Sequence, residues 1–161
     1  ETLVRGEPQP PTRFVRDLLT DVQCPVLIVP PEYQEINKGV LLYDGEPSSV
    51  YAIKMFSYLM PSLHNLETEV LSVNELGEGV HLEYNHLMKE FMKRHFPKAK
   101  YRITQGQPEE EIVMELHVQP EGAMAVLGAY RRTTVSRWFR ASMADVLMKK
   151  LTMPLFIAHN K

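Results

Sequence analysis

Short apolar runs alternate along the chain with longer segments in which apolar residues recur every three or four positions. The short runs predict β-strands and the longer segments predict amphipathic helices. The expected strands are CPVLIVPP (24–31), GVLLYDG (39–45), LETEVLSVNE (66–75), KAKYRITQG (98–106), AMAVLGA (123–129) and MPLFIAH (153–159). The expected helices are TRFVRDLLTDVQ (12–23), SSVYAIKMFSYLMPSL (48–63), HLEYNHLMKEFMKRHF (81–96), PEEEIVMELHV (108–118) and SMADVLMKKL (142–151), the second capped by Ser48 or Ser49. Strands that alternate with helices are typical of a parallel, doubly wound α/β sheet, in which ligands bind at the carboxyl ends of the strands.

The helix and strand that close the chain repeat the pattern of the helix and strand that open it. FVRDLLTDVQCPVLIVP (14–30) and MADVLMKKLTMPLFIAH (143–159) each contain an amphipathic helix, a few polar or small residues, a proline and four apolar residues. The matching positions are Leu18 with Leu147, Val22 with Leu151, Pro25 with Pro154 and Ile28 with Ile157. Helix–strand units resemble one another in general, but this match favours a true internal repeat.

The repeat predicts two parts of unequal completeness. Residues 1–37 are interpreted as the end of a first repeat with its linker, and residues 38–161 as one complete domain. The incomplete helix–strand unit cannot leave its apolar face and its strand edges in water. We therefore expect the 25–30 strand to lie beside the 153–158 strand, in the same chain or in a second copy.

Composition excludes several classes of protein. The 161 residues are 44% hydrophobic and 24% charged, with a net charge of −2. This is ordinary for a globular protein and lacks the strongly basic footprint of a nucleic-acid binder. Apolar runs of about five residues are far shorter than the roughly 20 that span a bilayer, so no membrane segment is expected. A single cysteine, Cys24, excludes an internal disulfide and suits a cytoplasmic protein; its place at a strand start predicts that it is buried.

The stretch GAYRRTTVSRWFRAS (128–142) is the strongest candidate for a ligand site. It joins an expected strand to an expected helix, which is the layout of many phosphate-binding loops. Such loops need glycine where the backbone approaches the phosphate, and here arginines and an alanine stand in the loop instead. Because parallel strands end at one edge of a sheet, we expect this loop to meet the Asp-Gly end of the 39–45 strand.

Four segments follow one another in the order GVLLYDGEPSSVYAIKMFSYL, EVLSV, AVLGAYRRTTVSRWFRASMADVL and MPLFIAH. In this order they resemble the universal stress protein family, in particular its tandem-domain cytosolic members typical of Bacteroidetes-type bacteria. The resemblance covers residues 38–161 as a full domain and residues 12–31 as the end of another. It implies a three-layer α/β sandwich like that of the adenine-nucleotide alpha hydrolases, with a five-stranded parallel sheet. It also implies dimers, or tandem pseudo-dimers, joined by antiparallel pairing of the fifth strands.

Many members of that family bind ATP through the motif G-x2-G-x9-G-(S/T). On this chain the first glycine falls on Gly128, the second on Arg131, the third on Ala141 and the hydroxyl residue on Ser142. The resemblance further assigns Asp44, with Gly45 beside it, to the adenine end of the site and Val73 to the adenine pocket; Arg132 joins Arg131 as a candidate phosphate contact. Two of the motif glycines are therefore lost.

Each candidate also has an interpretation that needs no ligand. Ser142 with Asp145 forms the S-x-x-D pattern of a helix capping box, and Asp44 and Gly128 can each serve only a turn of the chain. Arg131 in place of glycine either blocks the pocket or pairs with a phosphate as a charged fork. The loop arginines form either an anion site or a solvated face; they are Arg131, Arg132, Arg137 and Arg140.

No pattern in the sequence indicates catalysis. The six histidines have no metal-ligand spacing, and no nucleophile stands beside an evident base. We expect a regulatory protein of the stress response that is not an enzyme, has a degenerate ATP site and holds no cofactor, with ATP as the one candidate. It would act by self-association through the 153–158 and 25–30 strands or through other protein partners. The alternatives are an ATP switch in which Arg131 and Arg132 replace the motif glycines, a weak ATPase, and the cytosolic tail of a membrane transporter.

Overall fold

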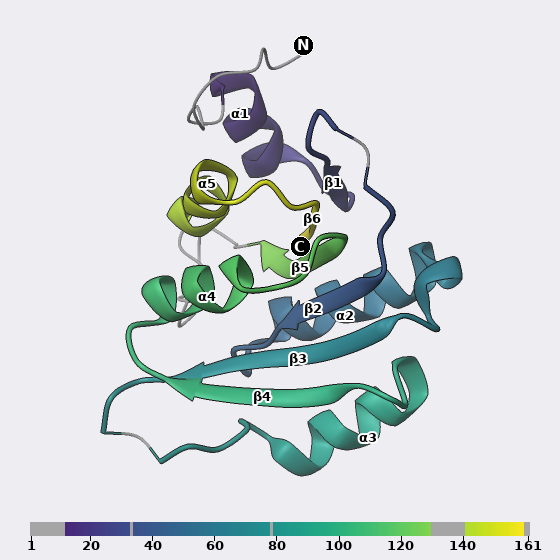
Figure 1. Cartoon of the computed structure of the whole chain (residues 1–161), viewed down its shortest axis with the longest axis vertical. Coiled ribbons are helices and arrows are strands. Elements are labelled where there is room, and N and C mark those ends of the chain that lie inside the picture. The colour runs from purple at the N-terminus through teal and green to yellow at the C-terminus, as the bar shows by residue number, and fades with distance from the viewer. Residues whose placement is uncertain (1–11, 33, 78, 130–140, 160–161) are drawn as a thin grey trace.

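A computed structural model of the chain describes residues 12–32, 34–77, 79–129 and 141–159 (Figure 1). The strands are β1 (Val26–Ile28), β2 (Lys38–Leu42), β3 (Glu67–Asn74), β4 (Lys100–Gln105), β5 (Ala123–Ala129) and β6 (Leu155–His159). The helices are α1 (Arg13–Asp21), α2 (Pro47–Leu59), α3 (Asn85–His95), α4 (Pro108–His117) and α5 (Ala141–Lys150), with a short 3-10 turn, η1 (Pro61–Leu63), after α2. The predicted order of strands and helices is confirmed.

The sheet is six-stranded and mixed, in the order β1-β6-β5-β2-β3-β4. Strands β4, β3, β2, β5 and β6 are parallel, and β1 is antiparallel to β6. The expectation of a five-stranded parallel sheet is therefore wrong for the sheet as a whole, because β1 pairs with the open edge of β6. The expected neighbour of the 25–30 strand is confirmed, and the pairing occurs within one chain.

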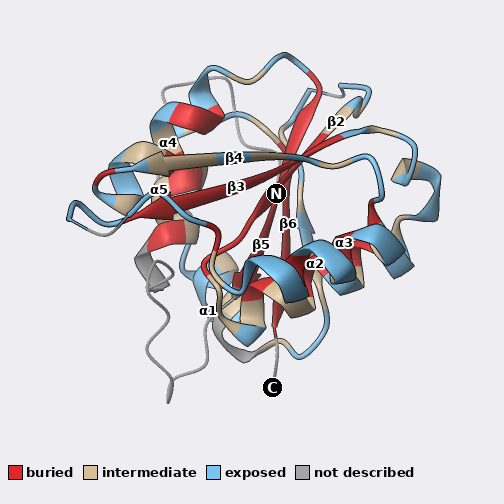
Figure 2. Ribbon diagram, turned by 90° about the horizontal axis from the view of Figure 1, so that it is seen from below, coloured by how far each residue is buried: buried red, intermediate tan, exposed pale blue. Residues whose placement is uncertain are grey.

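Two helix layers enclose the sheet, which agrees with the expected three-layer sandwich. One apolar cluster combines residues of β2, β3, β5 and β6 with α4 and α5, and α1 packs against it through Leu19. The other combines the opposite face of the sheet with α2 and α3. The inner strands β2, β3 and β5, together with β6, are almost entirely buried between these layers, whereas β4 and β1 at the two edges are only partly buried (Figure 2). Burial on both faces explains why β2, β5 and β6 read as continuous apolar runs.

The helix ends correct two details of the sequence analysis. α2 begins at Pro47 with Glu46 as its N-cap, so the expected cap at Ser48 or Ser49 is wrong. Proline is well suited to the first helical position because its missing N–H would have no partner there. Ser49 lies inside the helix and donates its hydroxyl to the main-chain oxygen of Glu46 at 2.8 Å. Cys24 is exposed, not buried, because the strand begins only at Val26 and the cysteine lies in the bend before it.

Among the helices that the structure describes, none is both long enough and apolar enough to cross a bilayer.

Candidate functional site

The register of the sheet brings three of the predicted site residues to one edge. Leu42 of β2 lies opposite Leu71 of β3, and Leu41 of β2 lies opposite Val126 of β5. Asp44, Val73 and Gly128 each lie two residues after one of these paired residues. They therefore lie near the carboxyl ends of the adjacent strands β2, β3 and β5. The parallel topology thus supplies the convergence that the sequence predicted.

The Asp44–Gly45 pair forms the turn from β2 into α2. Asp44 is 2% exposed, and its Oδ1 accepts a hydrogen bond from the backbone N–H of Glu46 at 3.0 Å. Gly45 has φ +83°, and a Cβ on it would lie 2.9 Å from Cβ of Glu83. A side chain at position 45 would therefore be strained by its backbone and crowded by its neighbour. Both residues have a structural task in the turn.

Gly128 allows α2 to approach the end of β5. A Cβ on Gly128 would lie 2.4 Å from both the carbonyl carbon and the oxygen of Ser48, and 2.8 Å from the backbone nitrogen of Ser49. Real Cβ contacts are never this short, so any side chain would push the first turn of α2 away from the sheet. Close helix–strand packing is sufficient to explain this glycine.

Val73 belongs to the core on the α4 and α5 side of the sheet. It is 2% exposed and shares its apolar cluster with Leu42, Leu71 and Ile112. Its side chain therefore contributes to packing whatever else the backbone beside it binds.

The remaining predicted residues are described only in part. Arg131 and Arg132, like Arg137 and Arg140, lie outside the described residues. Ser142 is the second residue of α5, and only its backbone is described. Asp145, the other half of the predicted capping box, forms an ion pair with Arg16 of α1 at 3.0 Å.

Sequence reasoning missed a segment, residues 79–84, that packs over this edge of the sheet. Asn74, 3% exposed at the end of β3, accepts a hydrogen bond through Oδ1 from the N–H of His81 at 3.1 Å. The hydroxyl of Tyr43 donates to the main-chain oxygen of Glu83 at 2.9 Å. Burial, followed by the negative charges of Asp44 and Glu83, raises the pKa of Tyr43 to about 12. The signal in the sequence was a polar residue, Asn74, that ends β3 directly after the apolar Val73.

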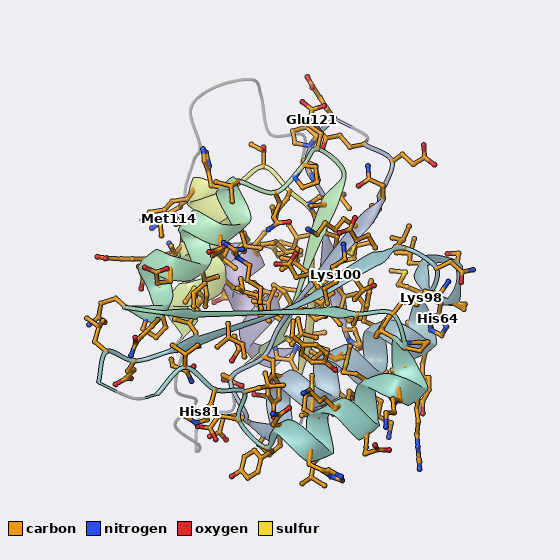
Figure 3. All side chains as sticks on the ribbon, turned by 60° about the horizontal axis from the view of Figure 1, so that its bottom comes forward. His64, His81, Lys98, Lys100, Met114 and Glu121 are labelled. Carbon is orange, nitrogen blue, oxygen red and sulfur yellow. The ribbon has the colours of Figure 1, made fainter. Side chains whose placement is uncertain are left out.

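This edge offers no metal site among the residues described. His81 pairs with Glu83 at 3.3 Å, and it lies on the opposite side of the molecule from His64 (Figure 3). No group of three histidine, cysteine, aspartate or glutamate residues in the described ranges is arranged to hold a metal ion.

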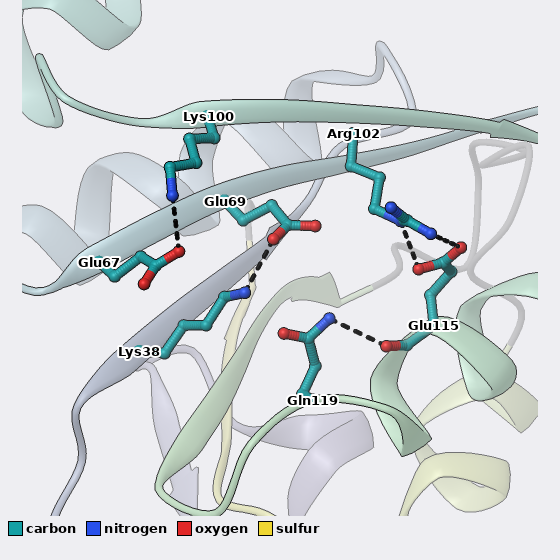
Figure 4. Close-up of polar contacts among 7 residues, drawn as sticks. All are labelled: Lys38, Glu67, Glu69, Lys100, Arg102, Glu115 and Gln119. Carbon is teal, nitrogen blue, oxygen red and sulfur yellow. Dashed lines mark hydrogen bonds and ion pairs between the residues drawn. The ribbon is translucent and has the colours of Figure 1, made fainter.

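The amino-terminal half of the sheet, away from this edge, carries a set of ion pairs. Lys38 pairs with Glu69 at 2.8 Å, and Lys100 pairs with Glu67 at 3.0 Å (Figure 4). Arg102 on β4 forms a two-point contact with Glu115 of α4, whose main-chain oxygen accepts from the amide of Gln119. Each of these charged side chains contacts one of opposite charge. The pairs therefore link β2 to β3, β3 to β4 and β4 to α4 along the amino-terminal half of the sheet.

Comparisons with known proteins find the same fold. No protein-family model matches the sequence, and a search of curated proteins also gives no match. Among solved structures, the hypothetical protein MJ0577 superposes with a TM-score of 0.63 at 19% identity, over 80% of this chain and 99% of that one. A universal stress protein from Archaeoglobus fulgidus gives 0.64 at 14% identity, over 90% of this chain and 53% of that one. A universal stress protein solved in complex with cAMP gives 0.57 at 14% identity, over 80% of this chain and all of that one.

The first two of these alignments differ in how much of the other protein they span. The chain covers about half of the Archaeoglobus protein and almost the whole of MJ0577. At identities below one fifth, such likeness establishes architecture and not activity. The chain therefore has the fold of the universal stress proteins.

Proposed function

We propose that the protein is a cytoplasmic regulatory module of the universal stress family, of its tandem-domain type, with a degenerate nucleotide site and no catalytic activity. The observation that carries this proposal is that the predicted site residues retained in this chain each have a structural role in the fold. Asp44 caps the turn before α2, Gly45 makes that turn, and Gly128 admits the helix. None of these tasks needs a nucleotide, and Arg131 and Ala141 stand where the family motif has glycine.

The two replacements are expected to weaken nucleotide binding strongly. If the backbone at Arg131 needs a positive φ, the side chain costs on the order of 1 kcal/mol in conformation alone. Ala141 is the first residue of α5, and a helix N-terminus is where a phosphate would approach the backbone. Glycine at this position of the family motif leaves the backbone open to that approach, whereas alanine adds a methyl group. A total of several kcal/mol would lower affinity by some orders of magnitude, since about 1.4 kcal/mol is tenfold.

We assign the interaction surface to the segment that contains α1 and β1, because four of its apolar side chains are exposed. In the repeat, each of these positions corresponds to a fully buried position of the complete domain. The pairs are Phe14 (68% exposed) with Met143 (2%), Leu18 (38%) with Leu147 (0%), Leu27 (41%) with Phe156 (2%) and Val29 (62%) with Ala158 (0%). In the complete domain β5 and α2 flank β6, and α4 packs on α5.

We therefore propose that a second α/β unit of the same fold covers α1 and β1, as a preceding repeat or as a second copy of the chain. The Archaeoglobus protein, of which this chain spans 53%, has the length for two such units. If the second unit is another copy of the chain, self-association would use the outer edge of β1, because β1 is the last strand of the described sheet and already pairs with β6.

Calorimetry with ATP, ADP and cAMP, with and without Mg²⁺, tests the degenerate site. Mass spectrometry of the purified protein first checks that no nucleotide has co-purified. We expect no binding of any of the three up to millimolar concentration. The double variant Arg131→Gly with Ala141→Gly should gain measurable affinity, because it restores the motif glycines. Micromolar binding by the unmodified protein would overturn the proposal.

A second candidate function is a nucleotide switch in which Arg131 and Arg132 supply the phosphate contacts. It is favoured by the convergence of Asp44, Val73 and Gly128 at one edge and by the bound cAMP of a structural neighbour. Under this alternative, the unmodified protein binds and Arg131→Gly weakens binding. Release of phosphate from ATP by the same samples would instead indicate the weak ATPase.

A further inference from the structure

The contact between α1–β1 and α5–β6 has an approximate two-fold symmetry that the sequence repeat makes visible. The repeat pairs each residue of 14–30 with the residue 129 positions later, so Leu27 corresponds to Phe156. In the antiparallel pairing of β1 with β6, Leu27 lies opposite Phe156 itself. Val26 opposite Ile157 and Ile28 opposite Leu155 exchange places under the same rule. The pseudo-two-fold axis thus passes through the Leu27–Phe156 pair.

The ion pair between the two helices joins one more pair of corresponding positions. Arg16 and Asp145 are 129 residues apart and correspond in the repeat. Their side chains meet at 3.0 Å across α1 and α5, which lie next to each other (Figure 1). Residues that correspond across a two-fold axis would be identical in a symmetric dimer. Here they have opposite charge.

This difference has a direct consequence for a second copy of the chain. If two copies paired through β6 in the same register, α5 would face α5 and Asp145 would face Asp145 of the partner subunit. Like charges at this contact repel, whereas the charge of Arg16 attracts.

A main-chain contact and two apolar positions of this interface do not make this distinction. The ring of His159 donates to the main-chain oxygen of Leu19. Met148 corresponds to Leu19 in the repeat, so a second copy would offer an equivalent carbonyl. The apolar positions Ile28 and Val22 correspond to Ile157 and Leu151, which are similar in shape. Main-chain and apolar contacts would therefore accept either occupant.

We propose that Arg16 and Asp145 are the specificity-determining pair of this interface, selecting α1–β1 as the occupant of the α5–β6 face and rejecting a second α5–β6. The ion pair holds α1–β1 against α5–β6, and any self-association then takes place through another surface. This inference does not depend on whether the nucleotide site is active.

Charge reversal in the full chain tests the first half of the proposal. Arg16→Asp places two carboxylates in contact, and the backbone amides of β1 should then exchange hydrogen about three to tenfold faster, as expected for a partly exposed ion pair turned into a repulsion. The double variant Arg16→Asp with Asp145→Arg should restore the original rate. Arg13→Asp is the matched control, because Arg13 lies on the same helix and pairs only with the exposed Asp17 at 3.6 Å among the ion pairs described.

Sedimentation equilibrium tests the second half. Arg16→Asp loosens β1 but leaves Asp145 to repel a second copy, so this variant should associate no more strongly than the unmodified chain. Arg16→Asp with Asp145→Asn removes that repulsion and should associate several-fold more strongly, with β6 amides still protected while β1 amides exchange. The proposal is overturned if Arg16→Asp exchanges like Arg13→Asp, or if the two Arg16 variants associate equally.

Discussion

Replacing Gly128 with alanine should destabilise the protein more than an ordinary glycine-to-alanine change in a strand. The added Cβ would lie 2.4 Å from the carbonyl carbon and oxygen of Ser48, about 1 Å inside the 3.4 Å at which ordinary contact begins. These are backbone atoms in the first turn of α2, so no side-chain rotation relieves the overlap. Overpacking of a core typically costs about 1–3 kcal/mol, and we expect Gly128→Ala to cost about 3 kcal/mol.

The loss of stability in Gly128→Ala would arise from a movement of α2. To make room, the first turn of α2 must move away from β5, and α2 carries Ala52, Ile53 and Phe56 into the core on that side of the sheet. Some of their buried apolar contact would be lost along with the strain of the overlap. The destabilisation should therefore appear as a lower midpoint of unfolding with an unchanged dependence on denaturant.

Gly39→Ala is the matched control for this prediction. Gly39 is buried in β2, and the nearest atom to its added Cβ would be Cε1 of Phe56 at 3.7 Å, an ordinary contact. We expect this change to be neutral or slightly stabilising, because alanine loses less chain entropy on folding. Equilibrium unfolding in urea measures both variants. If Gly128→Ala falls within about 0.5 kcal/mol of Gly39→Ala, packing does not explain this glycine and a ligand role regains support.

Two further predictions concern a buried tyrosine and a partly buried histidine. Tyr43→Phe removes the hydrogen bond to the main-chain oxygen of Glu83 and should cost about 1 kcal/mol in urea unfolding; unchanged stability would show that the hydroxyl does not hold segment 79–84. Burial, with nearby cations, lowers the pKa of His95 below its ordinary 6.5, and its Nδ1 contacts the hydroxyl of Ser57 at 2.7 Å. The unfolded chain then binds a proton more readily than the folded one, so stability should fall as the pH drops from 6.5 through the lower folded-state value. His95→Asn should flatten this fall and His117→Asn, at an exposed position of α4, should not; equal pH profiles for both would contradict the assignment.

Much of the fold could be predicted because the local spacing of apolar residues indicates which segments form strands and which form helices. The apolar runs of β2, β5 and β6 are continuous because these strands are covered on both faces, and the neighbour of the 25–30 strand followed from the repeat. The helix start at Pro47 was misjudged because two serines beside it looked like caps. The convergence of Asp44 and Gly128 at one edge was predictable from parallel topology alone. Their roles as nucleotide ligands stay a prediction.

By itself, the sequence determined the order of the elements, the likeness of segment 14–30 to segment 143–159, and the presence of arginine and alanine at positions 131 and 141. These are properties of the chain read locally or compared with itself. Only the tertiary structure decided that β1 adds an antiparallel strand within the same chain, that Gly128 faces the backbone of Ser48, and that Arg16 meets its own counterpart, Asp145. Each of these contacts joins segments that are distant in the sequence and come together only when their apolar faces are buried. A local sequence pattern does not specify which distant segments will meet.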